Sequence, residues 1–284
     1  VLVQVPRAGY LPGLACATCR APARCLSCGG PLGTPSGGAV PACRWCGVPA
    51  AAWSCPGCAG TRLRATTVGS TRTAEELGRA FPRIPVRASG GSAPVLATVG
   101  PEPALVVATP GAEPVAAEGY AAALLLDGWA LLARPDLRAA EEALRRWTAA
   151  CALVRPRDHG GQAVVMADAG HPAVQALVRW DPATFAEREL ADRAALRLPP
   201  DVRMVSVTGQ GAALRDFLES VALPGDAEVL GPVPAAGGQE RFLVRAALPA
   251  GRALASALRE AAGVRSAHKD AGTVRLQVDP LVIA

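Results

Sequence analysis

The stretch CATCRAPARCLSCGG, residues 16–30, contains two Cys-x-x-Cys turns, and two more follow in CRWC at 43–46 and CPGC at 55–58. A turn of this kind directs two thiolates toward one point, and two such turns complete a tetrahedral zinc site. Disulfides fit poorly, because cysteines this close in sequence bridge awkwardly and no secretory signal is visible. The four turns therefore predict two zinc ions, with a redox dithiol as the alternative.

The spacing between the turns favours one grouping of the eight ligands. The fourteen residues between the second and third turns are rich in Gly and Pro and suit a zinc ribbon, in which turn, strand, strand and turn follow one another. We expect an inner site there and an outer site closed around it, although a sequential or crossed grouping also fits the spacing. The expected inner ligands are Cys25, Cys28, Cys43 and Cys46, and the expected outer ligands are Cys16, Cys19, Cys55 and Cys58.

Both expected sites are saturated by four protein ligands. No open position remains for a catalytic water, so we expect two structural Zn²⁺ ions. A segment of fewer than fifty residues with many Gly and Pro has little core of its own. Metal binding is then expected to supply the folding energy of this segment.

The composition sets few limits on function. The 284 residues suffice for one large domain or two to three small ones, and half of them are apolar. Eight thiolates remove eight charges and two Zn²⁺ add four, so the formal charge falls from +5 to +1. Charge alone therefore does not announce a nucleic-acid binder. With no signal peptide, lipidation motif or membrane-length apolar run visible, we expect a cytoplasmic fragment or a segment of a longer protein.

Strands and helices alternate from residue 1 to about residue 198, with the cysteine-rich segment inserted near the start. VLVQV at 1–5 predicts a strand, and later short apolar runs bounded by Gly, Pro and Asp predict buried parallel strands. These runs lie at 84–89, 94–100, 104–110, 122–127 and 161–168. The alternation predicts an α/β fold with a parallel sheet.

Helical patterns lie between these runs. One is expected to begin at Thr73 as the cap, with Glu76 at the capping-box position, and to end at Pro82. Others are expected within 135–154 and, as one or two helices, within 171–200. After Pro200 the order β-α-β-β-α-β predicts a separate small α+β domain of the two-layer, ferredoxin-like kind.

Several catalytic motifs are absent from the sequence. A P-loop requires Gly-Lys-Ser/Thr, and Lys269, the sole lysine, lies in AHKDAG. The histidines are expected to be solvated loop residues, and Cys151 a small buried apolar residue. Asp127 ends an apolar strand, where it either serves a functional site or caps a turn. We expect no catalytic residue.

Four features together resemble the PriA family of primosomal replication-restart proteins. They are RAGY at 7–10, the eight-cysteine spacing, RTAEELGRAFPRIPVRAS at 72–89 and FAERELADRAALRLPP at 185–200. The resemblance runs from residue 1 to about 281, and the cysteine order and the stretch 185–200 are its most specific parts. Family members act as superfamily-2, 3′-to-5′ DNA helicases that recognise stalled forks and help to reload the replicative helicase.

The resemblance implies a domain organisation. Residues 1–15 and 61–198 would form the second RecA-like helicase lobe, interrupted by a zinc-binding insertion at 16–60. Residues 199–284 would form the C-terminal domain, which touches DNA and the single-stranded-DNA-binding protein. The family's N-terminal DNA-binding region and first helicase lobe, with the Walker motifs, would lie outside this chain.

Two helicase motifs depart from the family pattern. Where motif V should supply Gln and Lys, residues 107–119 read VATPGAEPVAAEG, and where motif VI should supply a Gly-Arg-Ala-Gly-Arg run, residues 149–161 read AACALVRPRDHGG. Only Arg155 and Arg157 remain nearby. The missing arginines stabilise charge on the transferring phosphate. We therefore expect ATP hydrolysis to be absent or vestigial.

Three functions stay open. The first is a scaffold that binds forked or single-stranded DNA, the single-stranded-DNA-binding protein and primosome components, with no membrane partner. The second is an ATP-dependent helicase that needs a separate first lobe, and the third is a zinc-ribbon protein–protein adaptor. Candidate contacts are Arg20, Arg24 and Arg44, with Trp45 and Trp53 either stacking on bases or packing the small core. The resemblance adds Arg241, which falls where the family has a basic residue that contacts the single-strand-binding protein's tail.

Overall fold

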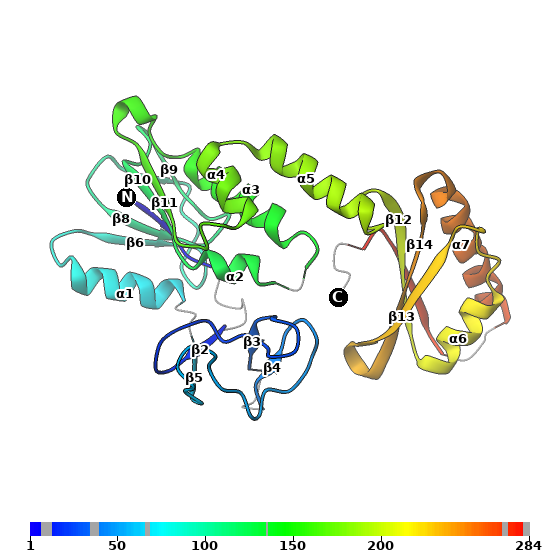
Figure 1. The fold of residues 1–284 in the computed structure, drawn as a ribbon. Helices are drawn as coiled ribbons and strands as arrows, with labels where there is room; N and C mark the ends of the chain where they lie inside the picture. The colour runs from blue at the N-terminus through cyan, green and yellow to red at the C-terminus, as the bar shows by residue number, and fades with distance from the viewer. Residues whose placement is uncertain (7–12, 35–39, 66–68, 135, 269–271, 281–284) are drawn as a thin grey trace. The chain divides into compact units, whose positions relative to one another are not determined.

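The computed structural model describes residues 1–6, 13–34, 40–65, 69–134, 136–268 and 272–280 (Figure 1). The chain divides into two compact units, Val1–Pro182 and Ala183–Ala284. The division falls upstream of residue 199, where the sequence places the start of the C-terminal domain. None of the described helices combines the length and the apolar composition needed to cross a bilayer.

A five-stranded parallel sheet forms the centre of the first unit, in the order β11–β10–β1–β8–β6. The central strand β1 pairs in parallel with β8 and β10, and Val3, Val5 and Val107 are buried in its core. The predicted α/β fold with a parallel sheet is confirmed. The strands are β1 (Leu2–Gln4), β6 (Val86–Ser89), β8 (Leu105–Ala108), β10 (Ala122–Leu125) and β11 (Gln162–Val165).

Two of the predicted buried strands differ in the structure. The run 94–100 does not join the sheet: among the described strands β7 (Thr98–Val99) pairs with β9 (Val115–Ala116) alone, and Val95 is 67% exposed. Gly90 and Gly91, both left-handed, turn the chain away at the end of β6. β11 pairs as predicted but lies at the sheet edge, where Val164 is 50% exposed. In these two segments an apolar run in the sequence therefore does not correspond to a buried strand.

Among its described residues the first unit contains the helices α1 (Ser70–Ala80), α2 (Gly128–Leu132), α3 (Ala139–Cys151) and α4 (Pro172–Arg179). The predicted cap at Thr73 is wrong, because α1 begins three residues earlier and Gly69 is its N-cap. Thr73 is buried inside the helix, and its N–H donates to Gly69 O at 3.0 Å. Glu76 pairs with Arg72 at 2.9 Å instead of completing a capping box. Burial of this helix face outweighs the local capping pattern.

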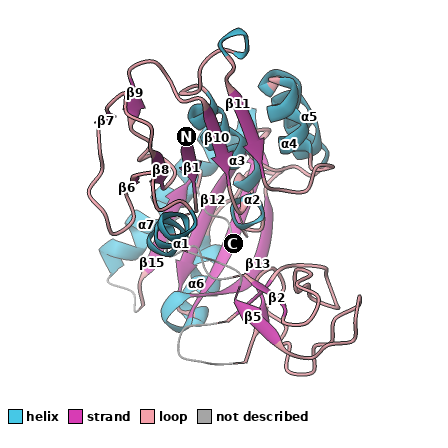
Figure 2. Ribbon diagram, turned by 90° about the vertical axis from the view of Figure 1, so that its left-hand side faces the viewer, coloured by secondary structure: helices cyan, strands magenta, loops and turns pink. Residues whose placement is uncertain are grey.

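The cysteine module, the described part of residues 13–65, has little regular structure. Antiparallel β2 (Leu14–Cys16) and β5 (Leu63–Ala65) lie side by side at its ends (Figure 2). Between them β3 (Leu32–Gly33) pairs with β4 (Ala42–Cys43), which gives the turn, strand, strand and turn of a ribbon. Its small core contains Leu14, Leu32 and Trp53 together with four buried cysteines.

The second unit contains α5 (Pro182–Ala195, which begins at the boundary) and the C-terminal sheet domain, formed by β12–β15 with α6 and α7. Its strand order β13–β14–β12–β15 is antiparallel throughout, and α6 and α7 cover one face (Figure 1). Leu214 and Phe217 of α6 and Leu254 and Leu258 of α7 are buried against that face. The predicted β-α-β-β-α-β arrangement is confirmed. The elements are β12 (Val202–Gly209), α6 (Gly211–Ser220), β13 (Glu228–Ala235), β14 (Gln239–Ala247), α7 (Gly251–His268) and β15 (Val274–Val278), with 3₁₀ turns at Ala236–Gly238 and Leu248–Ala250.

Candidate metal centres and their surroundings

All four Cys-x-x-Cys turns share one hydrogen-bond pattern. The carbonyl of the first cysteine accepts from the N–H four residues later, and its own N–H donates to the carbonyl five residues later. The first set of bonds, between 2.8 and 3.1 Å long, joins Arg20 N to Cys16 O, Gly29 N to Cys25 O, Gly47 N to Cys43 O and Ala59 N to Cys55 O. Because the turns are alike, each presents its two thiols in the same way.

The residue after the second cysteine takes a left-handed backbone conformation in every turn. Its φ is 71° at Gly29 and 73° at Gly47, but also 65° at Arg20 and 56° at Ala59. Glycine adopts this conformation without a steric penalty, whereas a residue with a Cβ does not. The second and third turns thus use glycine, and the first and fourth do not.

The thiols gather into two clusters. The outer centre joins Cys16, Cys19, Cys55 and Cys58, with Sγ–Sγ distances of 3.5 Å for Cys16–Cys58 and 3.5 Å for Cys19–Cys55. The distances greatly exceed the about 2.05 Å of a disulfide. Four sulfurs around one zinc, each about 2.3 Å from the metal, stand about 3.8 Å apart. The four thiols are therefore spaced for a tetrahedral metal ion.

The inner centre has the same geometry. It joins Cys25, Cys28, Cys43 and Cys46, at 3.7 Å for Cys25–Cys46 and 3.4 Å for Cys28–Cys43. In both centres the first cysteine of each turn is buried and the second is exposed. The grouping is the nested one, in which the outer turns enclose the inner turns along the chain.

Backbone N–H groups point at the sulfurs of the inner centre. Ser27 N donates to Cys25 Sγ and Trp45 N to Cys43 Sγ, each at 3.4 Å. Backbone N–H donors, first that of Cys28, lower the pKa of Cys25 to about 6. Gly30 N–H lowers the pKa of Cys28, but the thiols that face it, Cys43 first, raise it to about 12. Thiolates this close repel one another unless a cation lies between them, which is the chemistry of a metal site.

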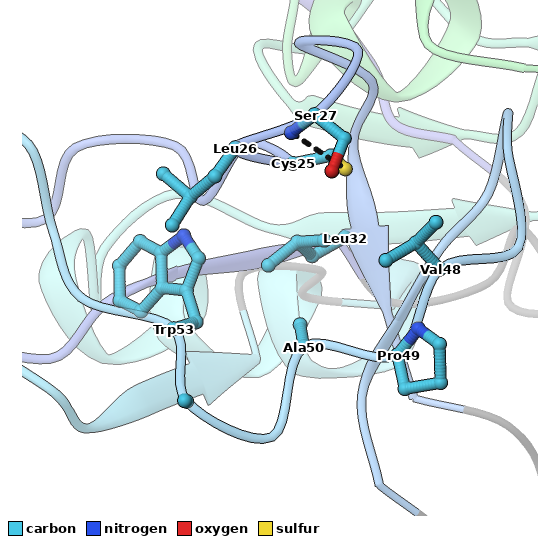
Figure 3. Close-up of a pocket in the computed structure, with 9 residues that line it drawn as sticks. Cys25, Leu26, Ser27, Leu32, Val48, Pro49, Ala50 and Trp53 are labelled. Atoms are coloured by element: carbon cyan, nitrogen blue, oxygen red, sulfur yellow. Dashed lines mark hydrogen bonds between the residues drawn. The ribbon is translucent and has the colours of Figure 1, made fainter.

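A hollow of about 200 Å³ lies beside the inner centre (Figure 3). Leu26, Leu32, Val48 and Trp53 line it, and the buried Cys25 lies at its wall. The Trp53 side chain is 4% exposed, and its Nε1 donates to Arg24 O at 2.9 Å. Trp53 therefore packs the module core, as one of its two predicted roles requires.

The other candidate contacts of the module differ in exposure. Trp45 is 54% exposed and packs over Gly30, and Arg20 and Arg24 are also exposed. The Arg44 guanidinium lies across Gly33, and partial burial lowers the pKa of Arg44. Of these candidate contacts, Arg20, Arg24 and Trp45 therefore lie at the surface of the module.

Arg241, the remaining candidate contact, belongs to the second unit. It belongs to β14, where it faces Thr208 of β12 and Val233 of β13 in the strand register. Its side chain is partly buried.

A contact that the sequence did not suggest lies at the carboxyl ends of the parallel strands. Gln4, 2% exposed at the end of β1, donates from Nε2 to Glu113 Oε1 at 2.6 Å. The other carboxylate oxygen of Glu113 accepts from Gly111 N at 2.8 Å. Ligands of open α/β sheets bind at this edge. The one signal in the sequence was a glutamine inside the apolar run 1–5.

Asp127 lies at the same edge, after β10. It is the N-cap residue of α2 in a left-handed conformation, and Trp129 Nε1 donates to its Oδ1 at 3.3 Å. Burial raises the pKa of Asp127. Asp127 thus stands at the start of the helix, but its side chain makes no capping hydrogen bond, so neither predicted role is established.

The remaining candidates have local structural roles. Arg155 donates from Nε to Glu118 O and Gly119 O, each at 3.2 Å, and Arg157 begins the short 3₁₀ turn Arg157–His159. His171 caps α4, because its Nδ1 accepts from Ala173 N at 3.2 Å. Cys151 is half-buried, and burial raises its pKa to about 11, which disfavours the thiolate. His268 ends α7, and Lys269 lies outside the described residues.

Comparison with known proteins identifies relatives for the whole chain. Residues 194–281 match the family model described as the primosomal protein N C-terminal domain. All of the chain aligns at 50% identity with the probable replication restart protein PriA of Mycobacterium leprae over 300 residues, and with that of Mycobacterium tuberculosis H37Rv over 305 residues. The chain covers 45% and 46% of these relatives, so it spans less than half their length. The predicted resemblance to this family is confirmed.

Proposed function

We propose that this chain, a relative of the PriA-type replication restart proteins along its whole length, binds forked DNA and recruits partners without hydrolysing ATP. DNA binding rests on the exposed arginines of the cysteine module, and the loss of ATP hydrolysis rests on a contact at the carboxyl ends of the parallel strands. There one oxygen of the Glu113 carboxylate accepts a hydrogen bond from Gly111 N, and the other accepts one from Gln4 Nε2. A negative group in this position repels phosphate oxygens, whereas phosphoryl transfer requires positive groups around them.

The two cysteine centres would hold one structural Zn²⁺ each. Each centre offers four sulfur ligands within 4.8 Å of one another, a donor set and number that suit tetrahedral Zn²⁺. The metal would neutralise half the charge of the four thiolates and tie together turns that have almost no apolar core between them. The zincs thus shape a surface and take no part in chemistry.

That surface is the proposed site of DNA contact. Arg20 and Arg24 are exposed and would contact phosphates, and Trp45 would stack on an unpaired base. Arg44 would add positive charge beside them. The described part of residues 13–65 contains five arginines and no aspartate or glutamate, so none of its own carboxylates competes with a phosphate.

The domain assignment follows from the same relationship. Residues 1–15 and 61–198 would be the second RecA-like lobe, residues 16–60 its zinc-binding insertion and residues 199–284 the C-terminal domain. The C-terminal domain, through Arg241, would contact the single-stranded-DNA-binding protein, and other primosome components would join at the fork. An ATP-dependent 3′-to-5′ helicase is the alternative within the same family, and the Glu113 carboxylate argues against it.

A protein–protein adaptor without a DNA role is the other candidate. The observation in its favour is the hollow between Leu26, Val48 and Trp53, which suits an apolar side chain of a partner (Figure 3). The small net charge of the metal-loaded chain also favours it.

The deciding experiment is a titration of the zinc-loaded chain against a fluorescent fork with a single-stranded arm, over a series of salt concentrations. We expect binding that weakens as salt rises, because Arg–phosphate contacts release counterions. The double variant Arg20→Ala/Arg24→Ala should bind more weakly, and its log–log salt slope should be shallower by about 2. The matched control Arg138→Ala/Arg179→Ala removes two exposed arginines of the same unit and should bind as the unchanged chain does.

Two outcomes would redirect the assignment. If the chain contains two zincs but does not bind the fork at low salt, the result would favour the adaptor function over DNA binding. ATP hydrolysis that is stimulated by the fork and lost in the Arg155→Ala/Arg157→Ala variant would restore the helicase function.

A further inference from the structure

We propose that the two cysteine centres fill in a fixed order, in which the inner centre binds its metal first and the outer centre binds last and releases its metal first. The inference rests on the two-zinc part of the proposed function but not on DNA binding. It follows from two independent differences between turns that otherwise have the same hydrogen bonds.

The first difference is the residue in the left-handed position. Both inner turns have glycine there, and a Cβ on Gly29 or Gly47 would meet no atom within 4 Å. Space therefore does not explain these glycines, and their backbone conformation does. The outer turns place Arg20 and Ala59 in the same conformation, where a Cβ disfavours the turn by about fivefold to thirtyfold per residue. Closing the outer centre must overcome this penalty twice.

The second difference is the length of chain that each centre closes. The facing sulfurs of the inner centre are 15 and 21 residues apart in sequence, whereas those of the outer centre are 36 and 42 residues apart. Each doubling of a flexible loop disfavours closure by about threefold. Once the inner centre has formed, the chain between the outer turns is shortened and the second closure becomes easier. Both differences therefore favour the same order.

The position of the outer centre gives this order a structural consequence. Cys16 ends β2 and pairs with Leu63 of β5, and Ala17 N donates to Arg62 O at 2.9 Å. The outer centre thus joins the two chain segments through which the module enters and leaves the rest of its unit. Release of the outer metal would loosen this junction, while β3, β4 and the inner centre stay closed. The outer centre therefore controls how firmly the module is attached to the rest of its unit.

A thiol-protection experiment on the unchanged chain tests the order directly. The metal-free, reduced chain receives one equivalent of Zn²⁺ and is then alkylated briefly, and trypsin cleavage after Arg20, Arg24 and Arg44 separates the reporting cysteines. One peptide carries Cys16 and Cys19 of the outer centre, and another carries Cys25, Cys28 and Cys43 of the inner centre. We expect the inner peptide to be protected and the outer peptide to be alkylated. Equal protection of both peptides, or protection of the outer one, would overturn the proposal.

A matched pair of mild variants tests the cause. Ala59→Gly removes the Cβ from a left-handed outer position, and Gly47→Ala adds one to the equivalent inner position. Against a chelator of known affinity, we expect Ala59→Gly to hold the second zinc about fivefold more tightly. We expect Gly47→Ala to weaken retention of the first zinc by about the same factor.

The total zinc content distinguishes failure of the proposed function from failure of the proposed filling order. If the saturated chain binds fewer than two zincs, the two-zinc part of the proposed function fails. If it binds two but the inner peptide is not the protected one, the proposed order is wrong while the two-zinc part of the proposed function stands. If Ala59→Gly leaves the second affinity unchanged, the left-handed residues are excluded as a cause of the order.

Discussion

The cysteine module and the C-terminal sheet domain are held together by different means. Half of the residues in the buried core of the module are cysteines, and the regular strands there are two or three residues long. The C-terminal sheet domain has a core of Val, Leu, Phe and Ala between two helices and one face of a four-stranded sheet. The core of one region is built on cysteines and that of the other on apolar side chains, so each should respond to a different perturbation.

The largest expected effect is the removal of metal. Structural zinc sites contribute on the order of 10–16 kcal/mol to the folding of small domains, and the module has little else to stabilise it. In amide hydrogen exchange we expect a strong chelator to abolish protection at Ala23 and Leu32, whose N–H groups bond within the module. Amides of the β12–β14 ladder should keep their protection. Retained protection at Leu32 in the chelated chain would show that the apolar core suffices.

Truncation of the apolar core should have the opposite effect: it should destabilise the C-terminal sheet domain and leave the cysteine module unchanged. Leu258 is 1% exposed on α7, so Leu258→Ala should destabilise the C-terminal sheet domain by about 2–5 kcal/mol. Val264 on the same helix is 57% exposed, and Val264→Ala should change stability by less than about 0.5 kcal/mol. Neither variant should alter the zinc content. Hydrogen exchange in the β12–β14 ladder measures the first effect, and a loss of zinc in Leu258→Ala would mean that the two regions fold as one.

A smaller effect is expected at the tryptophans of the module. Trp53→Phe keeps an aromatic ring but loses the bond from Nε1 to Arg24 O, which contributes about 0.5–1.5 kcal/mol. The control Trp45→Phe changes an exposed ring, so it should leave stability unchanged. The chelator concentration that releases half of the zinc should fall for Trp53→Phe and stay the same for Trp45→Phe. Equal shifts would mean that the contact of the Trp45 ring with Gly30 also stabilises the module.

The same contrast explains what could be predicted from the sequence. A Cys-x-x-Cys turn is a local structure, so its spacing indicates the ligands and the ribbon without knowledge of the rest of the fold. The order of elements after Pro200 is also local, and it was sufficient to predict the antiparallel domain. The α/β alternation predicted the parallel sheet in the same way.

Features that depend on distant contacts could not be predicted. Gln4 and Glu113 meet across a sequence separation of 109 residues, and no pattern near either residue indicates the other. Thr73 carried a local capping pattern, but burial of its helix face made it an interior residue. Likewise Arg20 and Ala59 are left-handed because the sulfur geometry requires it, although their side chains disfavour that conformation.

The smallest expected effect concerns a charged group of the C-terminal sheet domain. Arg245, which donates to Glu228 at 2.7 Å, and Arg197 hold the pKa of Glu228 below its usual value of 4.5. A carboxyl whose pKa is lower in the folded state stabilises that state above the unfolded pKa, and it loses this contribution as pH falls through the folded pKa. Glu228→Gln should therefore be less stable than the unchanged chain at pH 7, and the difference should shrink as the pH falls below 4.5. Thermal unfolding from neutral to acidic pH measures it, with Glu219→Gln, an exposed position on α6, as the control. If the difference in stability between Glu228→Gln and the unchanged chain stays constant with pH, Glu228 acts through packing rather than through its charge. The C-terminal sheet domain would then depend even less on polar contacts than its comparison with the module suggests.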